Sequence, residues 1–325
     1  MTVNAIRIHQ TGGPEVLRFE PVELNKPASG EALVRHTAIG VNFIDTYHRT
    51  GLYPLPLPAT LGMEAAGVVE ETGPDVSEVK PGDRVAYATP PAGAYAGARR
   101  IAAHRLVKLP DTVSDQQAAA MMLKGLTAHY LIRRTHRVER GETVLVQAAA
   151  GGVGLILCQW AKHLGATVIG TVGSEEKAAL ARDHGCDHTI LYRSENFTER
   201  VRQITGGAGV PVVYDSVGKD TFIGSLDCLR PLGMMVSYGN SSGPVTGVDL
   251  GWLSARGSLF VTRPSLMHYV AKREDLLAAA AELFEAVASG AVRIEVHQTY
   301  ALRDAATAHR DLESRRTTGS SILLP

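Results

Sequence analysis

The sequence predicts an α/β protein in which a doubly wound parallel sheet is joined to a second, β-rich domain. Residues 141–262 repeatedly alternate strand-like and helix-like segments with short joins, the pattern of a parallel sheet with helices on both faces. Residues 1–123 instead carry β-forming runs divided by turns. The chain has 325 residues, enough for two domains, and its 45% hydrophobic and 20% charged content is typical of packed globular proteins.

The N-terminal part has the pattern of a small bent sheet or barrel. Its first segment, MTVNAIRIHQ, is predicted to be a strand, and it lacks the long apolar core of a signal peptide. Further strands are predicted at 31–41, 67–73 and 81–87, the last of which opens with a Pro-Gly turn. The stretch 51–59, GLYPLPLPA, carries three prolines and is therefore expected to be an extended loop.

The central part begins with the strand ETVLVQA and the helix GVGLILCQWAKHLG. The strand 166–172 precedes a helix that Ser174 is expected to cap, with Glu175 and Glu176 in its first turn. Ser194 is expected to cap the next helix. The alternation then continues along the chain through VPVVYDSVG, KDTFIGSLDCLRP, LGMMVSYGN and GSLFVTR.

The C-terminal part holds a long amphipathic helix at 273–290, then a strand, a short helix and a last strand, SILLP. These elements do not extend the alternation neatly, so we expect them to fold back on the N-terminal domain. The predicted domains are 1–124 for the β-rich domain, 125–265 for the doubly wound domain, and 266–325 for a return to the first domain.

A glycine cluster, QAAAGGVG at 147–154, lies at the first strand-to-helix turn of the alternation. In a parallel sheet this turn lies at the carboxyl edge, where a helix N-terminus offers free N–H groups and positive partial charge. Glycines let a pyrophosphate approach the backbone closely. Although the spacing departs from G-x-G-x-x-G, and a purely structural glycine turn is the alternative, we predict phosphate binding by Gly151, Gly152, Val153 and Gly154.

The end of the second strand indicates which dinucleotide is bound. Units that prefer NAD carry Asp or Glu there, for the ribose 2′-hydroxyl, whereas this chain has Gly173 and Ser174. Lys177 follows one helical turn later, and Tyr192 ends the next strand. This uncharged mouth with a lysine and a tyrosine nearby predicts NADPH. The alternatives are that Lys177 is an ordinary exposed lysine, and that the neighbouring glutamates repel a phosphate.

Several segments together carry a resemblance to a known family; they are VNFIDTYHRTGLYP, LGMEAAGVVEETG, KPGDRVAY, GLTAHYL, AAAGGVGLILCQWAK, VYDSVG, MVSYGNSSG, GSLFVTRPSL and LESRRTTGSSILLP. The chain resembles the medium-chain dehydrogenase/reductase superfamily, and within it the quinone oxidoreductase (ζ-crystallin-like) family, with bacterial NADPH:quinone reductases most similar. The resemblance implies a Rossmann domain and a GroES-like catalytic domain that is built from both ends of the chain.

The resemblance also implies roles for particular residues. Thr127 is expected beside the nicotinamide, and Arg315 near the cofactor, with Arg263 as a weaker candidate. The ribose and diphosphate groove is expected to be lined by Ser216, Val217, Tyr238, Asn240 and Ser241.

The family's substrate loop matches the segment with Asn42, Tyr47 and Tyr53, which are the predicted catalytic residues. Asn42 is expected to hold the nicotinamide or the substrate carbonyl through its amide. Tyr47 is expected to stack on a quinone and donate a hydrogen bond. For each of these residues, packing within the loop is the alternative.

No metal site is predicted. Zinc-containing members of the superfamily carry a cysteine near position 42 and Gly-His-Glu at 62–64, whereas this chain has Asn42 and Met63 there. The three cysteines lie far apart in the sequence, which argues against a disulfide framework and indicates a reduced, cytoplasmic protein. No apolar run approaches the length of a membrane span.

The predicted function is NADPH-dependent quinone reduction without zinc. Two alternatives stay open: an NADPH-dependent reductase of enals, enones or enoyl thioesters, and an NADPH-binding structural or RNA-binding protein. The 33 basic and 33 acidic residues balance, which argues against nucleic acid as a partner.

A homodimer is expected through the last strand of the alternation, 257–263. Its apolar residues Leu259, Phe260 and Val261 lack the inward-pointing lysines that protect an exposed sheet edge. The alternative is that residues 266–325 fold over this edge and cover it.

Overall fold

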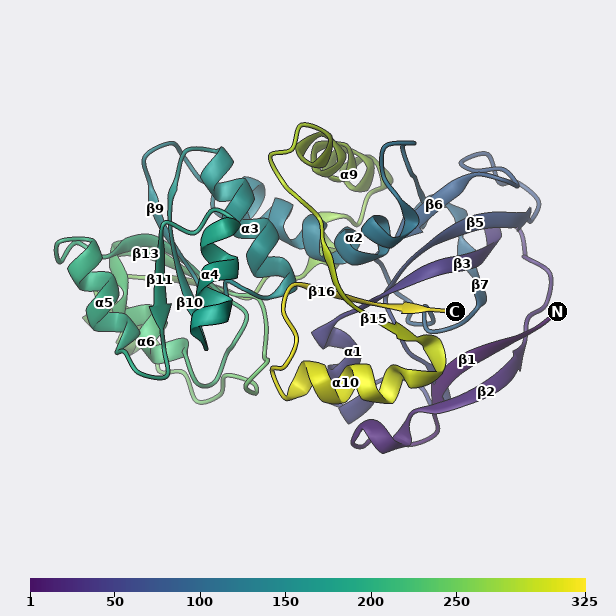
Figure 1. Ribbon diagram of the computed structural model, residues 1–325, viewed down its shortest axis with the longest axis horizontal. Helices are drawn as coiled ribbons and strands as arrows, with labels where there is room; N and C mark the ends of the chain where they lie inside the picture. Colours follow the sequence, from purple (N-terminus) through teal and green to yellow (C-terminus); the bar gives the residue numbers. More distant parts are fainter. The chain divides into compact units, whose positions relative to one another are not determined.

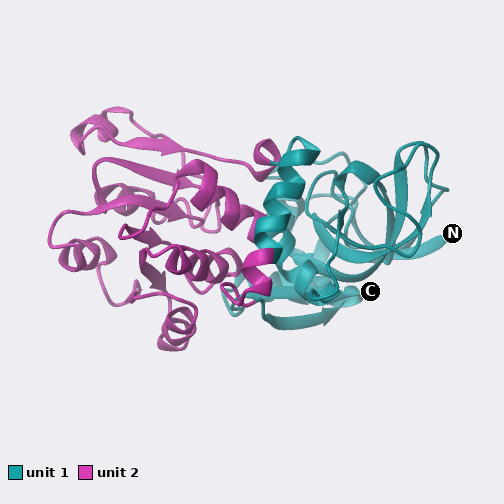
Figure 2. Cartoon of the chain, turned by 90° about the horizontal axis from the view of Figure 1, so that it is seen from above, with its two compact units in different colours: residues 1–124, 270–284, 294–325 teal, residues 125–269, 285–293 magenta.

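Residues 1–325 are all described by the computed structural model, and they divide into two compact units (Figure 2). Unit 1 comprises Met1–Lys124, Val270–Phe284 and Ile294–Pro325, and it contains both chain ends. Unit 2 comprises Gly125–Tyr269 and Glu285–Arg293. The segment 266–325, which we predicted to return whole to the first domain, is thus divided.

Two hydrogen bonds hold the short segment Glu285–Arg293 to unit 2. The backbone N–H of Arg293 donates to Gln159 Oε1 at 2.8 Å, and Gln159 Nε2 donates back to the Arg293 carbonyl at 3.2 Å. This pairing depends on residues far apart in the sequence, so the local pattern gave no sign of it.

The strands of unit 1 are β1 (Thr2–Ile8), β2 (Arg18–Glu23), β3 (Glu31–Val41), β4 (Ala59–Thr60), β5 (Glu64–Thr72), β6 (Arg84–Tyr87), β7 (Ala98–Ala102), β8 (Val107–Lys108), β15 (Val296–Ala301) and β16 (Ser320–Leu324). They form a three-stranded sheet, β2-β1-β4, and a seven-stranded sheet in the order β15-β16-β3-β5-β6-β8, with β7 paired to β3. Strand β16 is antiparallel to β3. The last strand, β16, thus belongs to the larger sheet of unit 1.

Unit 1 also contains α1 (Phe43–Thr50) and α10 (Ala305–Glu313), which lie side by side (Figure 1). Two longer helices, α2 (Asp115–Tyr130) and α9 (Arg273–Ala288), each span a boundary between the units. The apolar core of unit 1 includes Ile6, Ile39, Leu61 and Leu106, all of which are fully buried. Asn42 caps the start of α1, and Gly51 caps its end with a φ of 84°, which only glycine adopts easily.

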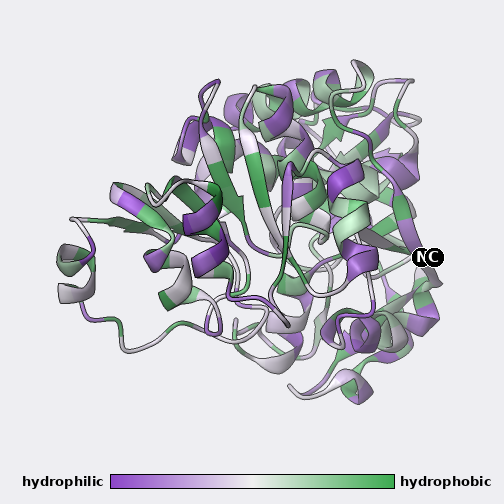
Figure 3. Cartoon of the chain, turned by 60° about the vertical axis from the view of Figure 1, so that its left-hand side comes forward, coloured by the Kyte–Doolittle hydropathy of each residue, from purple (hydrophilic) through white to green (hydrophobic).

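Unit 2 is built on six parallel strands, β9 (Thr143–Val146), β10 (Thr167–Val172), β11 (His188–Leu191), β12 (Val210–Asp215), β13 (Leu229–Ser237) and β14 (Phe260–Thr262). Their order is β11-β10-β9-β12-β13-β14, so the direction of winding reverses between β9 and β12. This is the doubly wound order, and the predicted fold class is confirmed. Hydrophobic residues follow the strands (Figure 3), and every residue of β12 is buried, as expected of a central parallel strand.

The helices of unit 2 are α3 (Gly152–His163), α4 (Glu175–Asp183), α5 (Phe197–Ile204), α6 (Phe222–Asp227), α7 (Gly251–Ala255) and α8 (Leu266–Tyr269). Ser174 caps α4 as predicted, because its side chain accepts from the backbone N–H of Lys177. The predicted Ser194 cap is wrong. Asn196 caps α5 instead and accepts from Thr198 and Glu199, since the first residues of SENF form a turn before the helix.

Strand β14 is the edge of the unit 2 sheet and pairs only with β13. It is shorter than the predicted 257–263, because Gly257 and Ser258 adopt positive φ angles of 95° and 58°. Leu259 is buried, whereas Phe260 is 56% and Val261 is 38% exposed. Apolar side chains are therefore exposed at this edge. No helix combines the length and apolar character that a membrane crossing requires.

Candidate cofactor and substrate sites

The turn between β9 and α3 lies at the carboxyl edge of the unit 2 sheet, beside the reversal of strand order. Gly151 is the N-terminal cap of α3 and has an extended conformation, with no side chain bonded to the first turn. The N–H groups that begin α3 therefore have no intrahelical acceptor and face the sheet edge. Ala148 holds the left-handed conformation, φ 55°, that makes the turn tight. The site fits an anion.

Glycine is needed at different positions of this turn for different physical reasons. A Cβ on Gly154 would lie 2.4 Å from the Ala148 carbonyl oxygen and 2.6 Å from that of Ala149, so α3 can pack on the turn only without it. A Cβ on Gly151 would meet only the Ala148 oxygen, at 3.2 Å. Gly154 thus provides close packing, and Gly151 leaves open space at the helix N-terminus. Gly152 and Val153, also predicted here, form the first turn of α3.

The end of β10 carries the residues predicted to choose between the two cofactors. Gly173 lies against Tyr192, whose hydroxyl would be 2.8 Å from a Cβ at that position. The Ser174 hydroxyl accepts the Lys177 N–H at 3.3 Å, which leaves its own proton available for donation. Lys177 is partly buried, whereas the side chains of Glu175 and Glu176 are exposed.

A buried polar network joins the ends of the three central strands. Thr171 donates to Gln147, Gln147 donates to Ser225 at 3.0 Å, and Ser225 donates to Asp215 at 2.9 Å. The other Asp215 oxygen accepts the N–H groups of Val217 and Gly218 at 2.7 and 3.0 Å. Asp215 therefore fixes the loop after β12, which includes the predicted Ser216 and Val217.

The loops after β12 and β13 are bonded to each other. The Ser241 N–H donates to the Ser216 carbonyl at 3.2 Å, and the Tyr238 N–H donates to the Asp215 carbonyl at 2.8 Å. With its amide oriented to satisfy both neighbours, Asn240 accepts from Arg263 Nη2 at 3.0 Å. Arg263 also donates to the Ser237 carbonyl at 2.7 Å, so it holds the loop that contains the predicted Tyr238, Asn240 and Ser241.

Two further predicted cofactor residues, Thr127 and Arg315, lie outside the loops that follow the strands of the unit 2 sheet. Thr127 is buried in the part of α2 that belongs to unit 2. Arg315 belongs to unit 1, follows α10 and has an exposed side chain. Its φ of 59° is unusual for a non-glycine residue and ends the helix sharply.

In unit 1, Asn42 is held at both its backbone and its side chain. Its N–H donates to Asp45 Oδ2 at 2.9 Å, and its Nδ2 donates to Glu64 Oε2 at 2.8 Å. Glu64 is fully buried and also accepts from the Leu123 N–H at 2.7 Å and from Lys124 Nζ at 3.3 Å. One Asn42 N–H is therefore committed to Glu64, and the orientation of the amide is fixed.

The aromatic side chains of the predicted substrate loop pack together. The Tyr47 and Tyr53 rings meet edge to face with centroids 5.2 Å apart, and Phe43 and His48 lie beside them at 6.3 and 6.2 Å. Tyr47 is buried and Tyr53 is partly exposed. Tyr53 is thus the more accessible phenol of the two.

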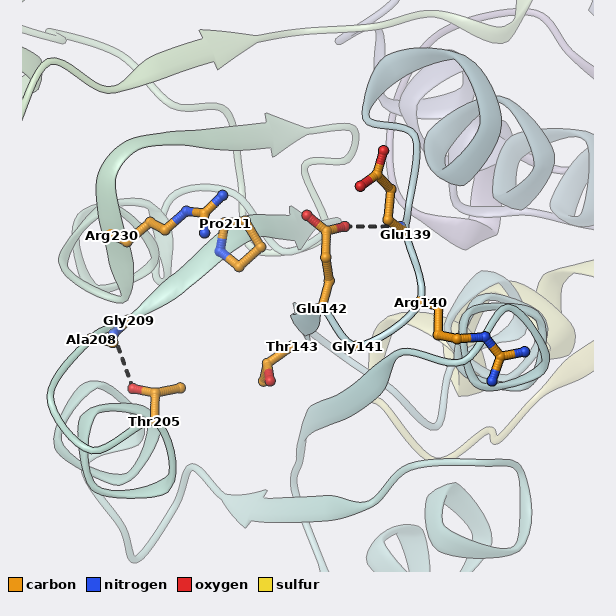
Figure 4. A pocket seen from close by; sticks show the side chains of 10 residues that line it. All are labelled: Glu139, Arg140, Gly141, Glu142, Thr143, Thr205, Ala208, Gly209, Pro211 and Arg230. Carbon is orange, nitrogen blue, oxygen red and sulfur yellow. Dashed lines mark hydrogen bonds between the residues drawn. The ribbon is translucent and has the colours of Figure 1, made fainter.

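Unit 2 also has a cavity away from these loops, at the amino ends of the parallel strands (Figure 4). It has a volume of about 430 Å³ and is lined in part by Glu142, Thr143, Gly209 and Arg230. Glu142 there accepts the backbone N–H of Glu139 at 3.0 Å. Ligands of doubly wound sheets bind at the opposite, carboxyl edge, so we do not assign the cofactor to this cavity.

Comparison with known proteins identifies the family. Residues 28–111 match the alcohol dehydrogenase GroES-like domain, and residues 152–285 match the zinc-binding dehydrogenase family. A quinone oxidoreductase from Pseudomonas aeruginosa is 57% identical over 315 residues, which cover 97% of each chain. The chain belongs to the quinone oxidoreductase family of medium-chain dehydrogenase/reductases.

Other relatives are equally complete. A 2-haloacrylate reductase from Burkholderia sp. is 51% identical over 334 residues, 99% of each chain. The crystal structure of Escherichia coli quinone oxidoreductase complexed with NADPH has a TM-score of 0.98 and 53% identity, and it covers 99% of this chain and all of that one. No group of three or more His, Cys, Asp or Glu side chains that could hold a metal occurs in this quinone oxidoreductase family member.

Several residues around Asn42 are not among the predicted site residues. Glu64 follows Met63 in the altered zinc motif, and the position of Lys124 within the apolar run AAAMMLKGL is itself a signal of a buried ion pair. Arg49, Tyr95 and His309, which are also buried, carry no local motif that marks them.

Proposed function

We propose that the protein is an NADPH-dependent quinone reductase. The observation that carries the proposal is the end of β10, where Gly173 and Ser174 stand in place of the acid that NAD-preferring units carry. Full-length relatives named quinone oxidoreductase, one of them solved with NADPH, support it.

The chain's residues fit this cofactor. We assign the diphosphate to the N-terminus of α3 at Gly151, Gly152 and Gly154, where N–H groups and open space coincide. We assign the 2′-phosphate to Ser174, Lys177 and Tyr192, which offer a hydroxyl proton, an ammonium group and a phenol. The bound cofactor would supply a hydride to the substrate.

The overall reaction takes one hydride from NADPH and one proton from solvent, and it converts a quinone to a hydroquinone. Because a quinone is already electron-poor, the protein's task is mainly to bring the two molecules together. Asn42 is the proposed anchor for the nicotinamide or the substrate carbonyl, since Glu64 fixes its amide orientation. We expected Tyr47 to stack on the quinone. Because Tyr47 is buried and Tyr53 is partly exposed, we assign the aromatic contact to Tyr53, with the Tyr47 ring packed against it.

The second candidate is reduction of an activated carbon–carbon double bond. The 51% identity to a 2-haloacrylate reductase over 99% of both chains favours it specifically. A screen of NADPH oxidation by purified protein over quinones, 2-haloacrylates, enals and enoyl thioesters decides between the two. Faster turnover of a haloacrylate or enal than of any quinone would replace the first proposal with the second.

We further propose a homodimer joined through β14. The exposed Phe260 and Val261 on an unpaired sheet edge support it. A two-fold axis at this edge would pair β14 with its copy and make one continuous sheet from the two doubly wound domains.

A further inference from the structure

A chain of buried polar side chains in unit 1 connects α10 to the Asn42 loop. Its members are Arg49, His309, Tyr95 and Asp45, each at most 1% exposed. Arg49 Nη1 lies 3.1 Å from His309 Nδ1, His309 Nε2 lies 3.1 Å from the Tyr95 hydroxyl, and that hydroxyl lies 3.0 Å from Asp45 Oδ2. Arg49 and Tyr95 are among the largest side chains that are fully buried in this protein.

Arg49 determines the direction of every hydrogen bond in this series of four side chains. A guanidinium can only donate, so His309 Nδ1 must accept and the imidazole proton must be on Nε2. Nε2–H then donates to the Tyr95 oxygen, and the Tyr95 hydroxyl donates to Asp45. Burial, with Arg49 as the second cause, lowers the pKa of His309 to about 3, which keeps the imidazole neutral and its two nitrogens distinct.

Arg49 and Asp45, the two end members of this series of side chains, are also held by other bonds. Arg49 makes two parallel bonds to Glu313, at 2.7 and 2.9 Å, and donates to the Gly12 carbonyl at 3.0 Å. At the other end, Asp45 Oδ2 receives both the Tyr95 hydroxyl and the Asn42 N–H. The carboxyl group that orients Asn42 is thus itself oriented by a donor whose proton cannot point elsewhere.

We propose that Arg49, His309 and Tyr95 are positioning residues that hold Asn42 in its working orientation. They act through Asp45, and none of them needs to touch the substrate or cofactor. The inference rests on the proposed function, because it assigns Asn42 a contact with the nicotinamide or the substrate.

Tyr95→Phe tests the proposal, because it removes one hydroxyl and leaves the ring in place. Tyr87→Phe is the matched control: the Tyr87 hydroxyl is equally buried in unit 1 and bonds a histidine, His36 Nε2 at 2.8 Å, but has no link to Asn42. In the cofactor-free protein, amide hydrogen exchange at the Asn42 N–H should accelerate at least about tenfold in Tyr95→Phe and stay unchanged in Tyr87→Phe.

Kinetics supplies the second readout. Tyr95→Phe should lower kcat at least about tenfold while the dissociation constant of NADPH changes little, since its proposed phosphate contacts lie in unit 2. In an Asn42→Ala background, Tyr95→Phe should lower kcat no further, because both changes remove the same orientation. Equal exchange and equal kcat in Tyr95→Phe and Tyr87→Phe would overturn the proposal.

Changes at His309 keep the test decisive if Tyr95→Phe folds poorly. His309→Gln retains an N–H toward Tyr95 and a carbonyl toward Arg49, so it should keep most of kcat, whereas His309→Leu should behave as Tyr95→Phe does. Equal kcat in the two His309 variants would contradict the inference. If Asn42→Ala itself leaves kcat unchanged, the proposed role of Asn42 fails, but the exchange result still reports on the positioning chain.

Discussion

Lys177 is partly buried beside Gly173 and Ser174, whereas its acidic neighbours face solvent. We expect Lys177→Glu to weaken NADPH binding by about 1–3 kcal/mol, the scale of one charge-assisted contact, and to leave NADH nearly unchanged because NADH has no 2′-phosphate. Fluorescence titration gives the dissociation constants of both cofactors. Arg182→Glu, in the last turn of the same helix, is the control for charge reversal. An equal loss for both cofactors would contradict the assignment.

Asp45 and His309 contribute oppositely to the pH dependence of stability. Burial raises the pKa of Asp45 from 3.8 to about 7 and lowers that of His309 from 6.5 to about 3. The folded state therefore binds the Asp45 proton more tightly than the unfolded chain does. As a result, the contribution of Asp45 to the free energy of unfolding falls as the pH rises from 3.8 to about 7. The unfolded chain binds the His309 proton more tightly, so the His309 contribution falls as pH drops below about 6.5.

Substitution separates these two contributions. The quantity compared is the free energy of unfolding that each protein loses when the pH is lowered from about 7 to about 4. Asp45→Asn should make this loss larger and His309→Gln should make it smaller, each by on the order of 3 kcal/mol. Urea unfolding at both pH values measures the change. A shift of the same sign in the two variants would show that the burial argument is wrong for one of them.

How far the site could be predicted depends on the range of each interaction. The glycine turn and the pair Gly173 and Ser174 follow a strand within a few residues, so the sequence pattern marks them. The polar chain from Arg49 to His309 joins segments at opposite ends of the sequence. Its pairing depends on the folded sheet of unit 1, and a single sequence holds no local signal for it.

At the scale of elements, the start of α3 provides a contrast between two glycines. Gly154→Ala should destabilise the protein by roughly 1–3 kcal/mol, because its methyl group would press on backbone oxygens that cannot move aside. Gly151→Ala should cost less stability, since its methyl group meets only one atom. Thermal unfolding without cofactor measures both. Equal destabilisation would show that the two positions are packed alike.

The edge strand β14 carries the prediction on assembly. If the exposed Phe260 packs against a second copy, Phe260→Lys should shift sedimentation at micromolar concentration from a dimer toward a monomer near 34.7 kDa. Leu277→Lys, which changes an exposed apolar residue of α9 in unit 1, should leave the dimer intact. A dimer that survives Phe260→Lys must use another surface, and a wild-type monomer would refute the pairing.

Element boundaries show where sequence patterns were insufficient. Strand β14 ends up shorter than the apolar run GSLFVTR, because the backbone angles of Gly257 and Ser258 turn the chain before pairing begins. Helix α5 begins after Asn196, because that side chain reaches two N–H groups of the first turn. Both outcomes depend on backbone geometry that alternation of apolar residues does not encode.

At the scale of the whole molecule, we expect activity without a metal. Asn42 and Met63 occupy the positions of the zinc ligands in metal-containing members of the superfamily, and Asn42 is already bonded to Glu64. Elemental analysis of active protein should find no stoichiometric zinc, and dialysis against a chelator should leave turnover unchanged. Loss of turnover that Zn²⁺ restores would contradict this prediction.

The last strand, β16, lies between β15 and β3 in the larger sheet of unit 1. A ribosome therefore synthesises β3 early, and it makes the neighbouring strand β16 only after all of unit 2. The whole of unit 2 is made in the meantime, so it can fold first, while the end of β3 that later pairs with β16, Ile39–Val41, waits without a partner on that side. During that interval the nascent chain exposes a strand edge that a chaperone, or a neighbouring polysome, could reach. A premature stop codon before Ser320 would make the exposure permanent.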